Sequence, residues 1–320
     1  MKFLVAVLLV VACTSAFLGR EDEDMFKFMK FVKEHNREYQ TFEEFHTRFE
    51  IFKSNLHKVD DHESFSPFMD MTETQFQSRL NLETSAIAAS RSKMERYTLS
   101  TKMGDLPTSF DWRDTKGVVN TIKDQGQCGS CWAFSAVANL EGLYFKKNGK
   151  SITLSEQQLV DCDRNDGGCN GGWMDKAFEW VQQNGGIESD KDYAYHGRDE
   201  SCRFDASKVA LQITGFKDIS QNEDEIARVL MENGPISVAL NANPLQFYSK
   251  GIISKTAREC SPRGLNHGVA LVGFGEEAGK KFWVVRNSWG QRWGEQGYFR
   301  MERGQGTCGI NTTASTATLN

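Results

Sequence analysis

The sequence of 320 residues has little proline, no strong excess of one charge and, beyond its first residues, no long hydrophobic run. With 5 Pro and 28 Gly in no repeating order, it is neither collagen-like nor of low complexity. The 38 basic and 43 acidic side chains give a net charge of −5, which argues against a protein that grips nucleic acid through a basic surface. The length allows about two domains of ordinary size.

The N-terminus holds the one apolar run. A basic residue, Lys2, precedes an apolar stretch that ends at Ala12, and small residues continue to Ala16. This order is typical of a secretory signal, and the stretch is too short to span a membrane. We therefore expect residues 1–16 to be a signal peptide, a soluble product that enters the secretory pathway, and no membrane span.

Cysteine is absent between residues 17 and 127, and seven cysteines follow, at positions 128, 131, 162, 169, 202, 260 and 308. Cysteines pair in an oxidising compartment, so an odd number indicates one free thiol. The uneven distribution predicts two parts of different construction. The first would be helical and the second cross-linked.

The first part contains no Gly or Pro between Glu21 and His62, which favours long helices. One stripe of unlike side chains falls on a single sector of such a helix: Glu44, Arg48, Phe52, Asn55 and Val59. A solvated helix face with an ion pair between Glu44 and Arg48 is the simpler interpretation. The polar stretch 82–102 that follows is expected to be an exposed, cleavable linker.

The second part opens near Leu106 with a candidate nucleophile. Cys131 precedes a helical pattern that runs to Lys147, so it is expected at a helix N-terminus. Unpaired N–H groups and the positive end of the helix dipole stabilise a thiolate there. Hydrolysis by a thiolate also needs a group that delivers a proton to the leaving amine.

Two histidines in the second part are candidates for that proton carrier. His196 lies in a polar, loop-like segment and is expected on the surface. His267 leads into an apolar, strand-like run, and its separation from Cys131 is one found between a nucleophilic Cys and its His. Asn287 follows a second such run, and its amide oxygen would accept the far N–H of His267.

Four motifs of the second part resemble the papain family of cysteine proteases. They are Gln-Gly-Gln-Cys-Gly-Ser-Cys-Trp-Ala-Phe from Gln125, Cys-Asn-Gly-Gly from Cys169, Asn-His-Gly from Asn266, and Asn-Ser-Trp-Gly from Asn287. Within the family the chain is most similar to endopeptidases of the cathepsin L and F types. The resemblance implies an α+β fold of two lobes, one helical and one β-barrel-like, with an active-site cleft between them.

The resemblance also implies roles for individual residues. Cys131 would attack the peptide bond and form a thioacyl-enzyme, His267 would be its ion-pair partner and general acid, and Asn287 would orient His267. Gln125 and the backbone N–H of Cys131 would form the oxyanion hole. Apolar residues would be preferred at P2, and the residues expected to contact substrate are Gly171, Gly172, Trp173, Met174, Ala239, Leu265, Gly268, Trp289 and Thr313. Trp289 would also shield the bond between Asn287 and His267 from water. No metal or cofactor is expected.

The family pattern implies the disulfides Cys128–Cys169, Cys162–Cys202 and Cys260–Cys308, with Cys131 free. The stripe from Glu44 to Val59 resembles a helix of the family's inhibitory propeptide. After the signal peptide at residues 1–16, the resemblance therefore implies an inhibitory propeptide at 17–105 and a peptidase at 106–320. The propeptide would run through the cleft against the substrate direction and be removed at acid pH, and its four histidines at 35, 46, 57 and 62 are a candidate trigger.

The expected partners are peptide and protein substrates, the chain's own propeptide and cystatin-like inhibitors, for an enzyme that is a monomer. Its destination would be the lysosome or vacuole, or the extracellular space. One alternative is a thiol–disulfide oxidoreductase, because Cys128-Gly-Ser-Cys131 is also a Cys-x-x-Cys motif. Its surroundings lack the Trp before the first Cys and the βαβ pattern of those enzymes. No spacing of Cys and His predicts a zinc site.

Overall fold

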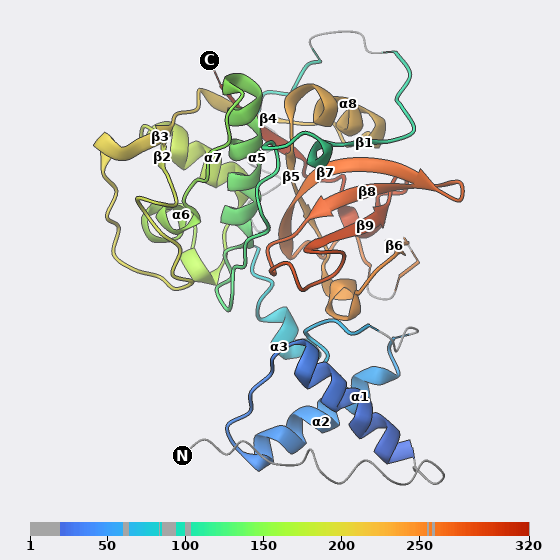
Figure 1. Ribbon diagram of the computed structural model, residues 1–320. Helices are drawn as coiled ribbons and strands as arrows, with labels where there is room; N and C mark the ends of the chain where they lie inside the picture. The colour runs from blue at the N-terminus through green and yellow to red at the C-terminus, as the bar shows by residue number, and fades with distance from the viewer. Residues whose placement is uncertain are drawn as a thin grey trace. The chain divides into compact units, whose positions relative to one another are not determined.

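The computed structural model describes residues 20–59, 64–82, 84, 94–99, 104–254, 256–257 and 260–319 (Figure 1). The predicted signal peptide lies outside these residues, as does His62. The chain divides into two compact units, Met1–Thr72 and Glu73–Asn320. Among the helices that are described, none is long and apolar enough to cross a bilayer.

The first unit is built on two helices of 15 residues each, α1 (Arg20–Glu34) and α2 (Phe42–Leu56). Phe28 of α1 lies with its ring centroid 5.3 Å from that of Phe52 on α2, and both side chains are fully buried. The chain leaves the helix without Gly or Pro, because Asn36 takes a positive φ of 49°. Asn tolerates this conformation better than most residues.

The stripe of unlike side chains lies on α2, except for Val59, which the sequence pattern wrongly placed on the helix that ends at Leu56. Arg48 Nη1 donates to the carbonyl of Asp70 at 2.9 Å. Asn55 Nδ2 donates to the carbonyls of Met69 and Met71, at 3.0 and 2.9 Å. Two residues of the stripe therefore contact one backbone turn and Phe52 is fully buried, so the stripe is not a solvated face.

The second unit has a helical lobe and a sheet lobe (Figure 1). The helical lobe contains α5 (Cys131–Asn148), α6 (Glu156–Cys162), α7 (Met174–Gln183) and a small sheet of β2 (Ile187–Glu188) and β3 (Val209–Leu211). Residues of α5, α6 and α7 share one buried apolar cluster. The unit also contains α3 (Glu73–Gln77), α8 (Glu223–Asn233) and the short 3-10 helices Trp112–Asp114, Gly168–Asn170, Ala206–Lys208, Asn243–Phe247 and Thr307–Gly309.

The sheet lobe is an eight-stranded sheet with the order β4-β10-β5-β7-β8-β9-β6, in which β1 also pairs with β7. The strands are β1 (Phe110–Asp111), β4 (Gly215–Asp218), β5 (Ile236–Leu240), β6 (Ile252–Ile253), β7 (His267–Glu277), β8 (Lys280–Arg286), β9 (Tyr298–Glu302) and β10 (Ser315–Thr318). All neighbours are antiparallel except β6 and β9. Among the described strands, β4 and β6 do not pair, so the lobe that we expected to be barrel-like is an open sheet.

Three disulfides cross-link the second unit: Cys128–Cys169, Cys162–Cys202 and Cys260–Cys308. They are the pairs that the family resemblance implies. The first two lie within the helical lobe and the third within the sheet lobe. Of the seven cysteines that the structure describes, Cys131 is the one without a disulfide, and it is buried. Because Cys128 pairs with Cys169, the Cys-x-x-Cys motif does not form the disulfide of an oxidoreductase.

A buried cluster of charges joins the two lobes. Lys123 Nζ lies 2.9 Å from Glu141 Oε1 and 2.7 Å from Glu156 Oε1. Arg286 at the end of β8 approaches the other oxygen of Glu141 at 3.5 Å. Burial raises the pKa of Glu156 to about 7, and the Lys123 charge opposes that shift. The cations of the cluster therefore compensate carboxylates that would otherwise be costly to bury.

Candidate active site

The start of α5 and the start of β7 meet at the candidate site. Cys131 is the first residue of α5, and His267 is the first residue of β7. A Cβ atom on Gly268 would lie 3.2 Å from the carbonyl oxygen of Cys131 and 3.3 Å from Cα of Trp132. The glycine thus permits β7 to approach the helix N-terminus closely, and it brings His267 to the same place as Cys131.

His267 is held by an amide and an aromatic ring. Its Nε2 lies 2.8 Å from Oδ1 of Asn287, and Trp289 stacks on the imidazole with a centroid distance of 4.7 Å. His267 is fully buried, and its Nδ1 has no hydrogen-bond partner among the described residues. Because Asn287 occupies Nε2, Nδ1 is the ring nitrogen left to take up or deliver a proton.

Gln125 is fully buried, and its side chain is fixed at both ends. Its Nε2 donates to the carbonyl of Cys128 at 3.0 Å, and its Oε1 accepts from the Ser288 hydroxyl at 2.7 Å. The backbone N–H of Ser288 donates to Oδ1 of Asn287 at 2.9 Å. Ser288 therefore connects the two predicted polar residues. Our sequence reasoning missed this role, although Ser288 lies inside the Asn-Ser-Trp-Gly motif.

The segment of residues 73–82, here called the covering segment, lies over this site. Phe76 contacts Trp289 edge to face, with a centroid distance of 5.6 Å. Further along, Arg79 Nη2 donates to the carbonyl of Gly126 at 2.5 Å. The carbonyl of Asn81 lies 3.9 Å from Cys131 Sγ. The covering segment therefore spans from the Trp289 ring to the thiol.

The covering segment also contacts two of the predicted substrate-binding glycines. Leu82 forms a parallel β-bridge with Gly172. A Cβ atom on Gly171 would lie 2.9 Å from the carbonyl of Asn81. These glycines thus have an extended chain beside them in the structure.

Burial determines the protonation of the covered site. It raises the pKa of the Cys131 thiol to about 11. Burial also lowers the pKa of His267 to about 4, where the Asn287 hydrogen bond opposes the shift and the Arg79 charge adds to it. In the covered site the pair is therefore a neutral thiol and a neutral imidazole at neutral pH.

Several of the residues predicted to bind the P2 side chain lie close together in the structure. Trp173, Met174 and Ala239 belong to one buried apolar cluster, against which Leu265 and Leu82 also pack. The Met174 sulfur lies 3.1 Å from the position of a Cβ on Gly268. Thr313 is buried, and its hydroxyl has no hydrogen-bond partner among the described residues.

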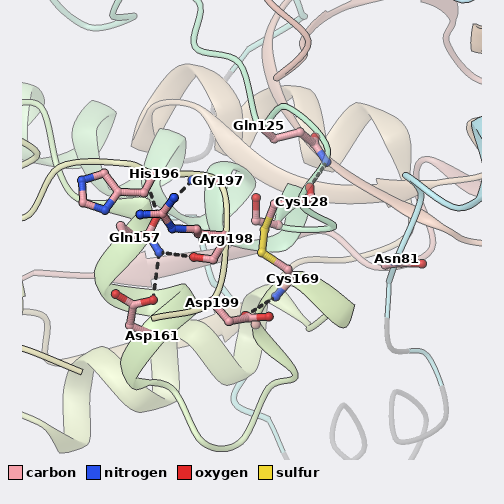
Figure 2. The surroundings of a disulfide bond; sticks show 12 residues. Asn81, Gln125, Cys128, Gln157, Asp161, Cys169, His196, Gly197, Arg198 and Asp199 are labelled. Carbon is pink, nitrogen blue, oxygen red and sulfur yellow. Dashed lines mark hydrogen bonds between the residues drawn. A yellow bond between two sulfur atoms is a disulfide. The ribbon is translucent and has the colours of Figure 1, made fainter. Parts of the chain in front are cut away.

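The Cys128–Cys169 disulfide ties the loop before Cys131 to the loop that carries the glycines predicted to bind substrate (Figure 2). The Cys169 N–H donates to Oδ1 of Asp199 at 2.7 Å, and Gly129 N–H donates to the Cys169 carbonyl at 2.9 Å. His196, on the same loop as Asp199, is exposed and pairs with Glu200 at 2.8 Å, as expected for a surface residue.

This arrangement has the chemistry of acyl transfer. An unpaired thiol at a helix N-terminus, an imidazole oriented by an amide, and a side-chain amide beside backbone N–H groups are what a covalent thiol mechanism requires. In the part of the chain that is described, no group of His, Cys, Asp or Glu could hold a metal ion.

Comparisons with known proteins agree with this chemistry. The family described as "Papain family cysteine protease" matches residues 106–318, and the "Cathepsin propeptide inhibitor domain" matches residues 28–78. Cysteine proteinase 15A of Pisum sativum is 42% identical over 314 residues, covering 90% of this chain and 85% of the pea protein. Cathepsin F of Drosophila melanogaster is 39% identical over 312 residues, covering 91% of this chain and 50% of the fly protein.

Solved structures give the same result. A digestive procathepsin L 3 from the larval midgut of Tenebrio molitor superposes with a TM-score of 0.81 at 35% identity, covering 92% of this chain and 99% of the insect chain. A second procathepsin from that midgut, procathepsin L2, gives 0.84 at 33% identity, covering 92% of this chain and 100% of the other. The chain therefore belongs to the papain family of cysteine proteases and carries that family's propeptide inhibitor domain.

Proposed function

We propose that Cys131 is the nucleophile of an endopeptidase and that His267 is its proton carrier. The supporting observation is the set of contacts around the imidazole. Asn287 hydrogen-bonds to Nε2, Nδ1 has no hydrogen-bond partner among the described residues, and β7 begins beside the N-terminus of α5. The Cys131 thiolate attacks the scissile carbonyl, His267 protonates the leaving amine, and water hydrolyses the resulting thioacyl-enzyme.

The oxyanion of the tetrahedral intermediate is bound by Gln125 Nε2 and by the backbone N–H of Cys131. One N–H of the Gln125 amide is engaged by Cys128, which leaves the second for substrate. The anchor of Gln125 Oε1 on Ser288 supports this role, because it fixes which end of the amide is the donor.

Substrate recognition uses the glycines and the apolar cluster already described. Gly171 and Gly172 pair with the backbone of an extended peptide. Because the bridge between Gly172 and Leu82 is parallel, a substrate that runs in the opposite direction to the covering segment pairs antiparallel. The P2 side chain enters the pocket formed by Trp173, Met174, Ala239, Leu265, Gly268 and Thr313, and Trp289 flanks the site. No acidic side chain belongs to this set, so the pocket prefers apolar residues such as Leu, Val or Phe.

The enzyme is made as a zymogen whose inhibitory propeptide comprises residues 17–105, ahead of a peptidase at 106–320. Support comes from the covering segment, whose contacts keep Cys131 fully buried and its thiol protonated. Removal of the propeptide exposes the site. It also allows the ion pair of Cys131 and His267 to form.

Acid pH promotes this removal through His35 of the first unit. The ring of His35 packs on Phe31 with a centroid distance of 5.0 Å, and its Nε2 donates to the Phe65 carbonyl at 2.9 Å. Burial lowers its pKa, with Arg37 adding to the shift and Glu34 and Asp70 opposing it. The folded unit then binds fewer protons than the unfolded chain, so its stability falls as pH drops below about 6.5.

Residues 1–16 direct the chain into the secretory pathway, and the monomeric enzyme acts in a lysosome or vacuole or outside the cell. The three disulfides support such a route, because they form in oxidising compartments. Peptides and proteins are its substrates, and cystatin-like proteins are candidate inhibitors.

The deciding experiment is hydrolysis of a fluorogenic dipeptide with Leu or Phe before Arg, after acid processing of the purified precursor with a mild reductant. Wild type and Cys131→Ser are compared, because serine keeps the shape of the site. Turnover by wild type alone, abolished by a thiol alkylator, is the expected result. No turnover by a wild-type chain that has demonstrably been cleaved near Leu106 would overturn the proposal.

A further inference from the structure

Ser130 precedes Cys131 at the N-terminus of α5, but its side chain does not cap the helix. A serine at this position usually accepts a hydrogen bond from the second or third N–H of the helix. Other helices of this chain follow that rule: Thr41 Oγ1 accepts from Glu44 N–H, and Ser155 Oγ accepts from Gln158 N–H. At Ser130 no such bond exists, and the fully buried hydroxyl instead lies 2.7 Å from the hydroxyl of Tyr195.

The direction of these hydrogen bonds follows from counting protons. The Tyr195 hydroxyl lies 2.9 Å from the carbonyl oxygen of Gln125, which can only accept. A phenol has a single proton, so Tyr195 donates it to Gln125 and accepts from Ser130. The Ser130 hydroxyl proton is therefore engaged, and its oxygen is turned away from the helix.

The position of Tyr195 is itself well fixed. Its ring meets that of Phe134 edge to face, with a centroid distance of 4.9 Å. The next residue, His196, donates its backbone N–H to Gln157 Oε1 at 2.7 Å, and Gln157 Nε2 holds the carbonyl of Arg198 at 2.7 Å (Figure 2). The phenol is thus placed by α5 on one side and by α6 on the other.

The helix N–H groups that Ser130 does not cap are available to the sulfur. Burial raises the pKa of the Cys131 thiol, and backbone groups of Gly268, Trp132 and Cys131, in that order, act on the sulfur and lower it. A serine hydroxyl that turned toward the helix would take the second or third N–H, and because the Ala133 N–H already donates to the Ser130 carbonyl at 2.9 Å, the Trp132 N–H is the donor for which it would compete. Burial is the main cause that raises the pKa of Tyr195, and the charges of Glu156, Asp124 and a Cys131 thiolate add to it, while the Ser130 hydrogen bond opposes it.

We propose that Tyr195 is a positioning residue for the nucleophile, which holds the Ser130 hydroxyl off the N-terminus of α5 so that the Trp132 N–H stays with the Cys131 sulfur. This inference rests on the proposed role of Cys131 as nucleophile. It concerns the ease with which the thiolate forms, and not the chemistry that follows.

The test is the pH dependence of alkylation of Cys131 by iodoacetamide in precursor that has been processed at acid pH. Tyr195→Phe removes the acceptor of the Ser130 hydroxyl and also the donor to the Gln125 carbonyl, a second loss that the double variant described below shares. We expect the acidic limb of the alkylation profile, and that of kcat/KM, to move up by about one pH unit. The double variant with Ser130→Ala has no competing hydroxyl, so its limb is expected to return to the wild-type position.

Tyr193→Phe is the matched control. The Tyr193 hydroxyl donates to Asp161 Oδ2 at 2.8 Å in the same buried region, so its loss perturbs packing without touching Ser130. Its acidic limb should coincide with that of wild type. Ser130→Ala alone leaves Tyr195 in place, should not move the limb, and serves if Tyr195→Phe does not fold.

Three results would overturn the inference: a Tyr195→Phe limb that coincides with wild type, a double variant that stays shifted, or a shifted limb in Ser130→Ala alone. Failure of the proposed function would look different. In that case alkylation of Cys131 in the wild-type enzyme would leave peptide hydrolysis intact.

Discussion

The covering segment makes a quantitative prediction about the reactivity of Cys131 in the intact precursor. Burial moves the thiol pKa from about 9 to about 11, so at neutral pH the covered site holds about a hundredfold less thiolate than an ordinary cysteine. The thiol is also fully buried, and reagent reaches it only when the segment opens. Labelling of the intact precursor should therefore measure how often the segment opens.

Phe76→Ala is the perturbation that should change this opening. Phe76 is 1% exposed, and its ring packs on that of Trp289. Truncating a buried Phe costs about 3–5 kcal/mol. If that loss falls on the closed state, the lower figure increases the open fraction by about a hundredfold, at about 1.4 kcal/mol for each factor of ten.

The assay is the rate of iodoacetamide incorporation at pH 7, with the rate for Cys131→Ser subtracted as background. Wild-type precursor should react at least about a hundredfold more slowly than processed enzyme, and Phe76→Ala should recover most of that difference. Gln77→Ala, an exposed change in the same short helix, should behave as wild type. The reasoning fails if intact wild-type precursor is labelled as fast as processed enzyme, or if the two alanine variants react alike.

Three further predictions concern the site, its activation and its stability. Asn287→Ala, which removes a 2.8 Å hydrogen bond to the imidazole, should lower kcat about 10- to 100-fold with little change in KM. A variant with the same kcat as wild type would show that the bond does not orient His267. His35→Gln keeps a donor for the Phe65 carbonyl but cannot gain a charge, so the midpoint pH of self-processing should move to lower pH. The control His46→Gln, at an exposed histidine, should leave that midpoint unchanged. The same shift in both variants would refute the role of His35. Lys123→Met leaves two buried carboxylates without their shared cation, so urea unfolding at pH 7 should show the processed enzyme destabilised by about 3–5 kcal/mol. This loss of stability should be smaller near pH 5, because Glu156, with a pKa of about 7, is then protonated.

The sequence was sufficient for those parts of the site that depend on local pattern. The helical pattern after Cys131 correctly placed that residue at a helix N-terminus, and the apolar run after His267 correctly placed it at the start of a strand. Both rest on contacts between near neighbours in the chain, and periodicity reports such contacts directly.

The parts that escaped prediction depend on contacts across the fold. Tyr195 is hydrogen-bonded to Ser130, 65 residues away in the sequence, and to Gln125, 70 residues away. No periodicity in the sequence relates residues so far apart. The helix break at Asn36 escaped for another reason: it uses a left-handed residue that is neither Gly nor Pro. Val59 was misplaced because its spacing suited a helix that had already ended.

The arrangement of the disulfides has a consequence for how the peptidase could be taken apart. Each of the three bonds closes a loop of 40 to 48 residues inside one lobe, and none spans the stretch between β3 and β4 where the chain passes from the helical lobe to the sheet lobe. A single cut at Gln212–Thr214 would therefore yield two separate polypeptides, even without reductant. One fragment would carry the thiol and the other the imidazole, so activity regained on mixing them would report the strength of the contacts between the fragments, which include the pairing of β1 with β7.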